Sequence, residues 1–447
     1  MTTPWLFERM VAWGDAPALV WNDSVTTYTE LSKLADEWRE KFSSRKIGPG
    51  QVVALDGSFS PNACGALIAL VRLGAIVAPL TPLMRAHRDK FLDIAEARLL
   101  VEFDEADAAT FYEFERTVTN SVTRKLIARG NPGLIIFSSG STGNPKAILH
   151  DFTSLLAKFH KVRQKKTTLT FLLFDHIGGI DTLFNTLASG GTVVTVPTRD
   201  PETVSKAIEK YQVHTLPASP TFLNLLLISG LFDQYDFSSL KVVAYGTEPM
   251  PSNTLTKLHE VFPDVSLVQT YGMSELGVLR SRSRDSESLW IKFSGEGFQT
   301  KVIDGILWVK ADAAMIGYLN APDLFDAEGW LNTQDAVEVD GEYLRILGRA
   351  SDLINVGGQK VYPAEVENAL LQMDNVREVA VFGKAHPMMG QIVAARFNLN
   401  APEPLAAFKR RLGAFCKDRL AAYQVPRLVE ISEGDQFGSR FKKLRNG

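Results

Sequence analysis

The first 270 residues alternate between short β-rich runs and helical patterns, and this alternation constrains the fold more than any other feature. Strands separated by helices predict a largely parallel sheet whose faces are covered by those helices. We expect helices over residues 29–45, 61–73, 203–211 and 252–261, and strands over residues 52–55, 75–79, 134–137, 169–174, 192–196, 241–245 and 266–269. The predicted fold class is therefore α/β, with layered sheets and helices.

The pattern changes near residue 290. Two Asp-Gly pairs, Asp304-Gly305 and Asp340-Gly341, separate alternating apolar runs and predict β-hairpins, which indicate a small antiparallel sheet or β-barrel. After Gly348 the expected order is β-β-α-β-β-α-β, with helices over residues 363–372 and 404–422. We expect a large N-terminal domain over residues 1–347 and a small α+β domain over residues 348–447.

Charge and cysteine content exclude several functional classes. The 48 basic and 51 acidic side chains give a formal net charge of −3, so the chain has no electrostatic footprint for nucleic acid or a membrane. Cys64 and Cys416 lie far apart and fit no metal spacing, which indicates a reducing compartment. The N-terminus has no signal-peptide pattern, and Arg72 interrupts the most apolar stretch. These features predict a cytoplasmic enzyme.

A loop rich in hydroxyl groups and glycine, FSSGSTGNPK over residues 137–146, follows an expected strand. Glycines allow successive backbone amides to form an anion-binding concavity, and the lysine adds a positive charge. The loop is not a Walker motif, because Pro145 stands at the place of the second glycine. A flexible surface turn is the alternative; we predict a phosphate site made by Ser138, Ser139, Gly140, Ser141, Thr142, Gly143 and Lys146.

A second motif, YGMSE over residues 271–275, follows another expected strand. Its aromatic ring could stack on a purine, Ser274 could donate to a phosphate, and Glu275 could hold Mg²⁺, which prefers one or two carboxylates plus substrate phosphates. Alone, the pentapeptide is also typical of an ordinary strand end. The preceding phosphate loop favours the nucleotide interpretation.

Together these two motifs resemble those of the adenylate-forming superfamily, which includes acyl-CoA synthetases, peptide-synthetase adenylation domains and luciferase. The similarity continues in the same order through YGTEP (245–249), GWLNTQD (329–335) and GRASDLINVGGQKVYPAEVE (348–367). The resemblance implies a mobile C-terminal lid. It also implies that ATP with Mg²⁺ activates a carboxylic acid to an acyl-AMP, from which a thioester with CoA is formed.

The resemblance also assigns roles to individual residues. Asp335 would hold the ribose hydroxyls, Glu275 and Thr142 the metal ion, and Asp352 would be the hinge of the lid. Gly357 and Gly358 would line the thiol channel. The remaining nucleotide contacts would come from Gly246, Thr247, Glu248, Thr270, Tyr271, Gly272, Ser274 and Arg349.

The catalytic lysine of the family lies near the C-terminus, in a Ser-Gly-Lys context. Here the chain ends GSRFKKLRNG, which places Lys442 at that position, with Lys443 as the neighbouring candidate. A solvated basic tail is the alternative interpretation. Three positions depart from the family pattern, since Gln334, Phe441 and Ala147 stand where glycines are usual.

The acid pocket is expected around FDHIGGIDTL, residues 174–183. His176 would orient the substrate carboxylate or gate the channel, unless it is a packed core histidine. Asp175 resembles the aspartate that holds an amino group in peptide synthetases, but a local backbone amide would also satisfy it. The other residues expected to line this pocket are Gly178, Gly179, Tyr245 and Met273.

The best function from the sequence is an AMP-forming acid–CoA ligase that acts on a small carboxylic acid. An enzyme that loads an amino or hydroxy acid onto the phosphopantetheine of a separate carrier protein is the second hypothesis. A homologue that binds nucleotide without catalysis is the third, and its support is the three departures. The sequence does not select the acid, because one fold serves many substrates.

Overall fold

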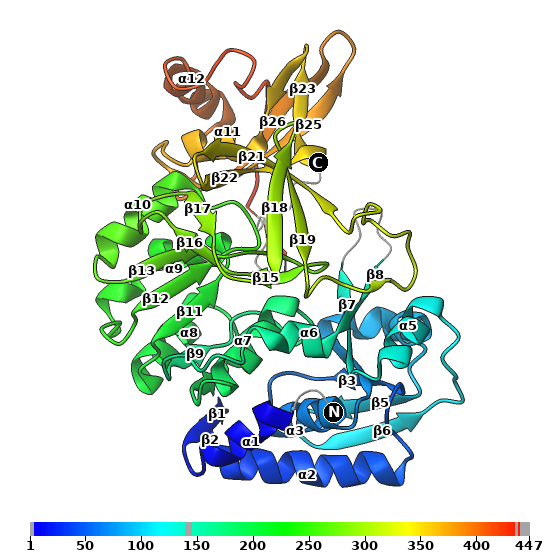
Figure 1. Ribbon diagram of the computed structural model, residues 1–447. Helices are drawn as coiled ribbons and strands as arrows, with labels where there is room; N and C mark the ends of the chain where they lie inside the picture. The colour runs from blue at the N-terminus through cyan, green and yellow to red at the C-terminus, as the bar shows by residue number, and fades with distance from the viewer. Residues whose placement is uncertain (1–3, 139–144, 434–436, 439–447) are drawn as a thin grey trace.

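The computed structural model describes residues 4–138, 145–433 and 437–438. Its α/β part contains two seven-stranded sheets with helices on their faces (Figure 1). The first sheet is mainly parallel, in the order β13-β12-β11-β9-β10-β1-β2, and the second is mixed, in the order β20-β8-β7-β4-β3-β5-β6. The strands of the first are β1 (Pro17–Trp21), β2 (Ser24–Thr27), β9 (Thr167–Leu169), β10 (Thr192–Val194), β11 (Thr215–Ala218), β12 (Val242–Tyr245) and β13 (Ser266–Gln269). Those of the second are β3 (Val52–Asp56), β4 (Ile76–Leu80), β5 (Leu99–Phe103), β6 (Ala109–Glu113), β7 (Gly133–Ser138), β8 (Lys146–Asp151) and β20 (Gly317–Tyr318).

Helix α2 illustrates how local sequence determines these elements. Thr27 accepts a hydrogen bond from the backbone of Glu30, whose side chain in turn accepts from the backbone of Thr27, so a capping box begins the helix. The buried side of α2 packs on α3, and a Cβ at Gly65 would lie 3.2 Å from Leu34, so this glycine permits the close approach. The helices are α1 (Pro4–Ala12), α2 (Tyr28–Ser44), α3 (Pro61–Arg72), α4 (Arg88–Ala95), α5 (Ser121–Arg129), α6 (Phe152–Ala157), α7 (Ile177–Leu187), α8 (Pro201–Tyr211), α9 (Pro220–Ser229), α10 (Ser252–Val261), α11 (Pro363–Leu370) and α12 (Leu405–Cys416).

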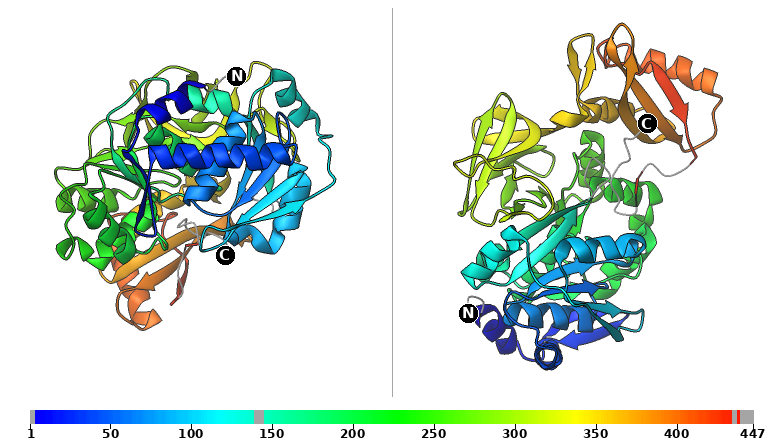
Figure 2. Two further views of the ribbon diagram at one scale, coloured as in Figure 1. Left: turned by 90° about the horizontal axis from the view of Figure 1, so that it is seen from below. Right: turned by 90° about the vertical axis from the view of Figure 1, so that its right-hand side faces the viewer.

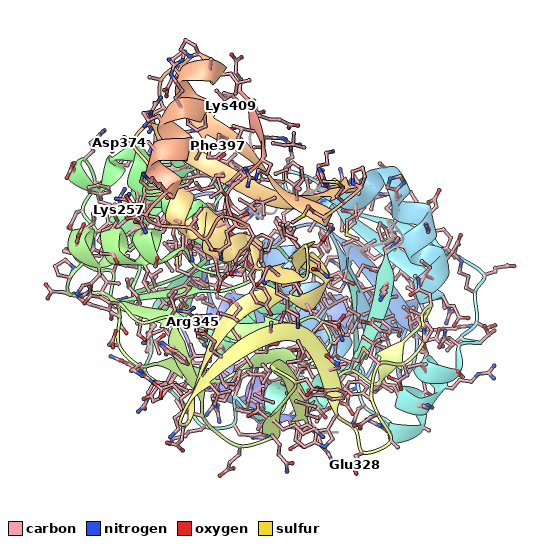
Figure 3. All side chains as sticks on the ribbon, turned by 90° about the horizontal axis from the view of Figure 1, so that it is seen from above. Lys257, Glu328, Arg345, Asp374, Phe397 and Lys409 are labelled. Carbon is pink, nitrogen blue, oxygen red and sulfur yellow. The ribbon has the colours of Figure 1, made fainter. Side chains whose placement is uncertain are left out.

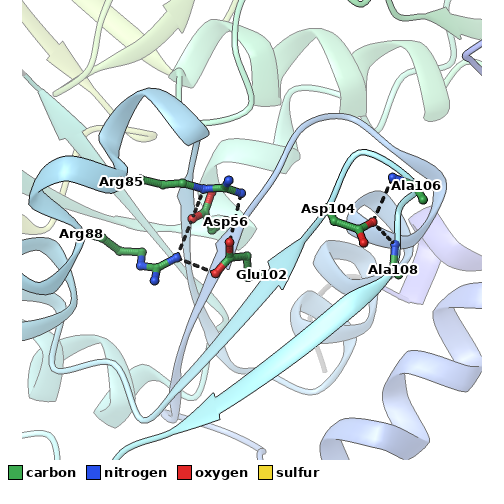
Figure 4. A network of polar contacts seen from close by, with 7 residues as sticks. All are labelled: Asp56, Arg85, Arg88, Glu102, Asp104, Ala106 and Ala108. Carbon is green, nitrogen blue, oxygen red and sulfur yellow. Dashed lines mark hydrogen bonds and ion pairs between the residues drawn. The ribbon is translucent and has the colours of Figure 1, made fainter.

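A buried ion-pair network fixes α4 to the second sheet (Figure 4). Asp56, at the end of β3, is fully buried and contacts Arg85 Nε at 3.1 Å and Arg88 Nη1 at 3.2 Å. Arg88 also contacts Glu102 of β5 at 2.7 Å. A buried carboxylate needs such partners, because removing its charge from water is costly. The network therefore sets the position of the segment that follows β4.

The expected antiparallel unit is a six-stranded sheet in the order β16-β17-β22-β21-β19-β18. Asp304 and Gly305 form the turn of its first hairpin, with φ values of 52° and 75°, as the Asp-Gly pair predicts. In the second hairpin the strands pair from Asp340 and Tyr343, so the turn residues are Gly341 and Glu342. The strands are β16 (Ser281–Ser283), β17 (Trp290–Phe293), β18 (Phe298–Ile303), β19 (Ile306–Ala311), β21 (Leu331–Asp340) and β22 (Tyr343–Arg349).

The C-terminal unit has its own hydrophobic core and lies beyond the antiparallel sheet (Figure 2). Its element order confirms the predicted β-β-α-β-β-α-β pattern, and Phe397 packs on Phe408 of α12 with ring centroids 4.8 Å apart. Figure 3 shows Phe397 and Lys409 in this unit and Arg345 on the neighbouring sheet. The strands are β23 (Ile354–Val356), β24 (Gln359–Val361), β25 (Val376–His386), β26 (Gly390–Leu399) and β27 (Leu428–Ile431).

Two expected elements differ from the structure. The strand expected over residues 169–174 ends at Leu169, because the following apolar residues form the irregular segment that leads into α7. The helix expected over residues 404–422 ends at Cys416, so its last six positions are not helical. In the first case Phe171 and Phe174 are apolar because they are buried, although they belong to no regular strand.

Candidate functional site

Asp335 is the centre of the first candidate site. It lies on β21 directly opposite Arg349 of β22, and its carboxylate accepts from Tyr271 Oη at 2.6 Å and from Arg349 Nε at 2.9 Å. Asp335 is only 8% exposed, and burial raises its pKa while Arg349 and Tyr271 act in the opposite direction. Burial and the Asp335 charge raise the pKa of Tyr271, which keeps that hydroxyl a donor. The pair of donors fixes the carboxylate and leaves lone pairs for a ligand.

A cavity of about 210 Å³ opens beside this carboxylate. Its lining comes from the end of β12, the junction of β13 with the short strand β14 (Tyr271–Met273), the paired strands β21 and β22, and the hinge segment. The structure thus brings together residues that are far apart in sequence: Gly246, Thr247, Glu248, Thr270, Tyr271, Gly272, Asp335, Arg349 and Asp352. All of them were expected at the nucleotide or at the hinge.

Close backbone contacts shape the loop after β12. A Cβ at Gly246 would lie 2.8 Å from the carbonyl oxygen of Thr270, so only glycine fits there. Thr247 has a φ of 73°, a left-handed conformation that is uncommon for a β-branched residue. Glu248 accepts a hydrogen bond from the backbone of Thr221 at 2.8 Å, which ties the loop to α9. This strain at a cavity wall is typical of a functional site.

The phosphate end of the site is described in part, because Ser139, Gly140, Ser141, Thr142 and Gly143 lie outside the described residues. Ser138 and Lys146 pair across β7 and β8 on either side of that loop. The Lys146 ammonium lies 5.1 Å from the ring centroid of Tyr318, whose hydroxyl donates to Glu275 Oε1 at 2.6 Å. Tyr318 therefore connects the expected phosphate lysine to the expected metal ligand. No sequence motif marks Tyr318, because its role depends on contacts between segments that are far apart in sequence.

His150 is a second contact that the sequence did not identify. It is fully buried, with Nε2 2.6 Å from the carbonyl oxygen of Ser274 and Nδ1 3.3 Å from that of Ala313. Burial lowers the pKa of this imidazole, while the two carbonyl contacts oppose the shift. His150 holds the turn that presents Ser274 and Glu275.

A second cavity, of about 510 Å³, adjoins the first and shares Gly246, Thr247 and Thr270 with it. Helix α7 forms one wall. A Cβ at Gly179 would lie 2.1 Å from the carbonyl oxygen of Leu173, so the first turn of α7 needs glycine there. Gly178, one residue earlier, lines the cavity. The two glycines therefore begin a helix instead of a plain turn.

The other residues expected in the acid pocket lie behind its wall. His176 caps α7, with Nδ1 accepting from the backbone of Gly178 at 3.0 Å. Asp175 is 1% exposed and accepts a hydrogen bond from Thr81 at 3.3 Å, which is a protein partner for this carboxylate. Tyr245 is buried in the core of the first sheet, and Met273 packs on the core of the antiparallel sheet. None of these four is among the residues that line the cavity.

Several polar residues that no sequence motif identifies also line this cavity. They come from the end of α6, the segment before β9, α7 and the start of β16, and include Lys158, Arg163, Asn185, Thr186 and Arg280. No local motif marks them, because loops far apart in sequence supply the charges. Of these residues, only Asn185 and Thr186 could have been noticed in the sequence, as polar positions on the otherwise apolar helix α7.

The described residues include the hinge segment and only part of the C-terminal tail. Gly357 and Gly358 form the turn between β23 and β24 with φ values of 57° and 88°. Lys442 and Lys443 lie outside the described residues. Phe437, close before them in sequence, lines a small cavity with Glu248 and Pro249, beside the loop after β12.

Curated proteins similar to this chain include CoA ligases. The 3-[(3aS,4S,7aS)-7a-methyl-1,5-dioxo-octahydro-1H-inden-4-yl]propanoyl:CoA ligase of Rhodococcus jostii is 26% identical, covering 100% of this chain and 98% of that protein. The 2-succinylbenzoate–CoA ligase of Bacillus licheniformis is 28% identical, covering 95% and 94%. Long-chain-fatty-acid–CoA ligase FadD13 of Mycobacterium tuberculosis is 26% identical, covering 91% and 89%.

Solved structures share the fold, and a family model identifies the chain. The anthranilate CoA ligase AuaEII in complex with anthranoyl-AMP has a TM-score of 0.83 at 20% identity, covering 98% of this chain and 95% of that one. A helix long and apolar enough to cross a membrane is not found in the described part of the chain. The AMP-binding enzyme model matches residues 6–318, and its C-terminal domain model matches residues 365–436. The chain therefore belongs to the family of AMP-binding enzymes.

Proposed function

We propose that this chain is an ATP-dependent acid–CoA ligase that forms an acyl-AMP and then a thioester. The observation that carries the proposal is the junction of the two cavities at Gly246, Thr247 and Thr270. A nucleotide beside Asp335 and a carboxylic acid beside α7 would meet at this junction. The CoA ligases among the relatives support the same reaction.

The first step joins the acid to AMP. A carboxylate oxygen attacks the α-phosphorus of ATP, the bond to the β-phosphate breaks, and pyrophosphate leaves. Such chemistry depends mainly on positioning and on neutralising charge. Asp335 would orient the ribose, and Lys146 would face the phosphates. Lys442, with Lys443 as the alternative, would supply positive charge at the bond that forms.

The residues near the phosphates fit a magnesium ion. Glu275 uses Oε1 to accept from Tyr318, and its Oε2 has no hydrogen-bond partner in the described part of the chain. One such carboxylate with substrate phosphates is enough for Mg²⁺, and Thr142 would add a hydroxyl. When bound, the ion would neutralise charge on the leaving pyrophosphate.

The second step transfers the acyl group. The CoA sulfur attacks the acyl carbonyl carbon, and the bond to AMP breaks. We propose that residues 348–447 rotate about Asp352 between the steps, so that Gly357 and Gly358 replace the lysine tail at the site. Closures of this size commonly limit turnover.

ATP–pyrophosphate exchange over a panel of acids, each with and without CoA, tests the reaction. Exchange with one class of acid and AMP release that requires CoA would support the ligase. AMP release that requires a phosphopantetheine carrier protein instead would favour carrier loading. Bound ATP without exchange for any acid would contradict catalysis.

Lysine variants test the role of the tail. Lys442→Ala should reduce adenylation about 10²–10³-fold, the usual cost of one charge-stabilising donor, while preformed acyl-AMP still reacts with CoA. Lys443→Ala is the matched control. Equal loss in both half-reactions, or a larger loss from Lys443→Ala, would contradict the assignment.

A further inference from the structure

The acid cavity carries more positive charge than an acid with one carboxylate requires. Four basic side chains line it, Lys158, Arg163, Lys166 and Arg280, against one acidic side chain, Asp181. Asp181 forms an ion pair with Lys158. Arg163, Lys166 and Arg280 have no ion pair among the residues that the structure describes, and Asp181, whose charge also acts on Arg163, is already paired with Lys158.

Two arginines, Arg163 and Arg280, line both this cavity and the surface cavity beside it. Arg280 donates from Nη2 to the carbonyl oxygen of Lys158 at 2.6 Å, and its buried Nε has no hydrogen-bond partner in the described structure. Arg163 lines the same cavity, and its pKa is lowered by partial burial and by the charge of Arg280, while the charge of Asp181 acts in the opposite direction. Both arginines also line the adjacent surface cavity of about 480 Å³, so they lie where the two cavities adjoin. An anion between them would relieve their repulsion.

The wall of the cavity is polar along its length. Helix α7 buries Ile180, Leu183 and Phe184 in the core, while its opposite side turns Asp181, Thr182, Asn185 and Thr186 to the cavity. Thr186 is 4% exposed, and its hydroxyl, like Asn185 Oδ1, is buried with no hydrogen-bond partner in the described residues. An alkyl chain would leave these groups unpaired, and each such group weakens binding by roughly tenfold.

We propose that this cavity selects a carboxylic acid of medium size with a second carboxylate, which binds Arg163 and Arg280. This inference rests on the proposed function, because the first carboxylate is the one activated at Gly246 and Thr270. The volume of about 510 Å³ lies in the range of small-molecule sites, so the diacid has room for several carbons or one ring. The hydroxyl and amide groups of α7 contact its polar middle.

Matched acids test the proposal by ATP–pyrophosphate exchange. The series contains the linear diacids from succinate to suberate with their hydroxy- and oxo-substituted forms, the benzene dicarboxylates, the monomethyl ester of each, and the monocarboxylic acid of the same length. We expect the best diacid to exceed its monomethyl ester in kcat/KM by at least about tenfold, the value of one charge-assisted hydrogen bond. An equal or better rate with the ester or the monoacid would overturn the inference and leave the proposed function intact.

Arg163→Gln tests the residue itself. The Arg163 side chain makes no hydrogen bond within the described structure, so the variant should fold, and we expect KM for the diacid to rise about tenfold while the monoester is unaffected. Lys165→Gln is the matched control, since Lys165 is exposed, lies two positions away and does not line the cavity. Equal losses for diacid and ester, or an equal effect of Lys165→Gln, would overturn the assignment. Silence with every acid, with ATP still raising the Tm, would overturn the proposed function and this inference with it.

Discussion

Asp335→Asn is the sharpest perturbation of the nucleotide cavity, because it keeps the size of the side chain and removes its charge. The carboxylate accepts from Tyr271 at 2.6 Å and from Arg349 at 2.9 Å while only 8% of the residue is exposed. An amide has a single acceptor oxygen, so it cannot accept from both donors with its two terminal atoms. The substitution therefore disturbs the carboxylate site without opening a cavity.

The contacts set the expected magnitude. A hydrogen bond to a charged group contributes about 1.5–3 kcal/mol, so losing one ribose contact should weaken ATP binding about 10-fold to 150-fold. Arg349 also donates to the carbonyl oxygen of Thr333 at 2.9 Å, so it keeps one partner in the variant. We therefore expect the free energy of unfolding to fall by about 1–3 kcal/mol, which leaves the protein folded.

The assay is calorimetric binding of ATP, 2′-deoxy-ATP and 3′-deoxy-ATP to both proteins. The wild type should lose about tenfold or more in affinity when the relevant hydroxyl is removed, and the variant should lose little further. If Asp335→Asn weakens all three nucleotides by the same factor and the deoxy penalties persist, Asp335 acts only on the structure of the site. That result would refute the ribose assignment.

Three further changes test neighbouring contacts. Tyr318→Phe removes the hydroxyl that holds Glu275 and should raise the Mg²⁺ concentration for half-maximal exchange by roughly tenfold; an unchanged Mg²⁺ dependence would contradict the metal assignment. Gln334→Gly relieves a φ of 60°, a strain of about 1–2 kcal/mol offset by about 0.5–1 kcal/mol of backbone entropy, so urea unfolding should show a gain of at most about 1.5 kcal/mol; a clear loss would refute this. Burial keeps the folded pKa of His150 below its usual 6.5. The contribution of neutral His150 to stability is therefore complete above pH 6.5 and is lost as pH falls from 6.5 to the folded pKa. Over that window the free energy of unfolding should change by up to about 1.4 kcal/mol per pH unit. Denaturant midpoints between pH 5 and pH 8 measure that slope, and His150→Gln should remove it.

Elements whose signals are local could be predicted from the sequence. The helix over Ser252–Val261 and the strand over Ser266–Gln269 have the predicted bounds, and the hairpin at Asp304-Gly305 follows from a turn that needs two positive φ values. The C-terminal order was also predicted, because each strand and helix there has its own turn or proline boundary.

The acid cavity could not be predicted from the same signals. Gly178 and Gly179 indicate a turn by propensity, yet they begin α7. Glycine is needed at Gly179, because the backbone of Leu173 lies too close for any side chain. Arg163 and Arg280 come from segments more than a hundred residues apart, and neither belongs to a motif. Their proximity depends on the packing of α6 and α7 between two sheets, which no local pattern encodes.

The departure at Gln334 bears on whether the chain has lost its catalytic role. A glycine before Asp335 is expected where the backbone needs a positive φ, and Gln334 adopts that conformation at 60°. Its amide donates to Asn332 at 2.9 Å, and the next amide donates to the Thr333 hydroxyl at 3.1 Å, so the strained bend is held by local hydrogen bonds. Asp335 consequently keeps both of its donors, although the side chain before it is unusual. The retained geometry therefore favours an enzyme that still binds its nucleotide here.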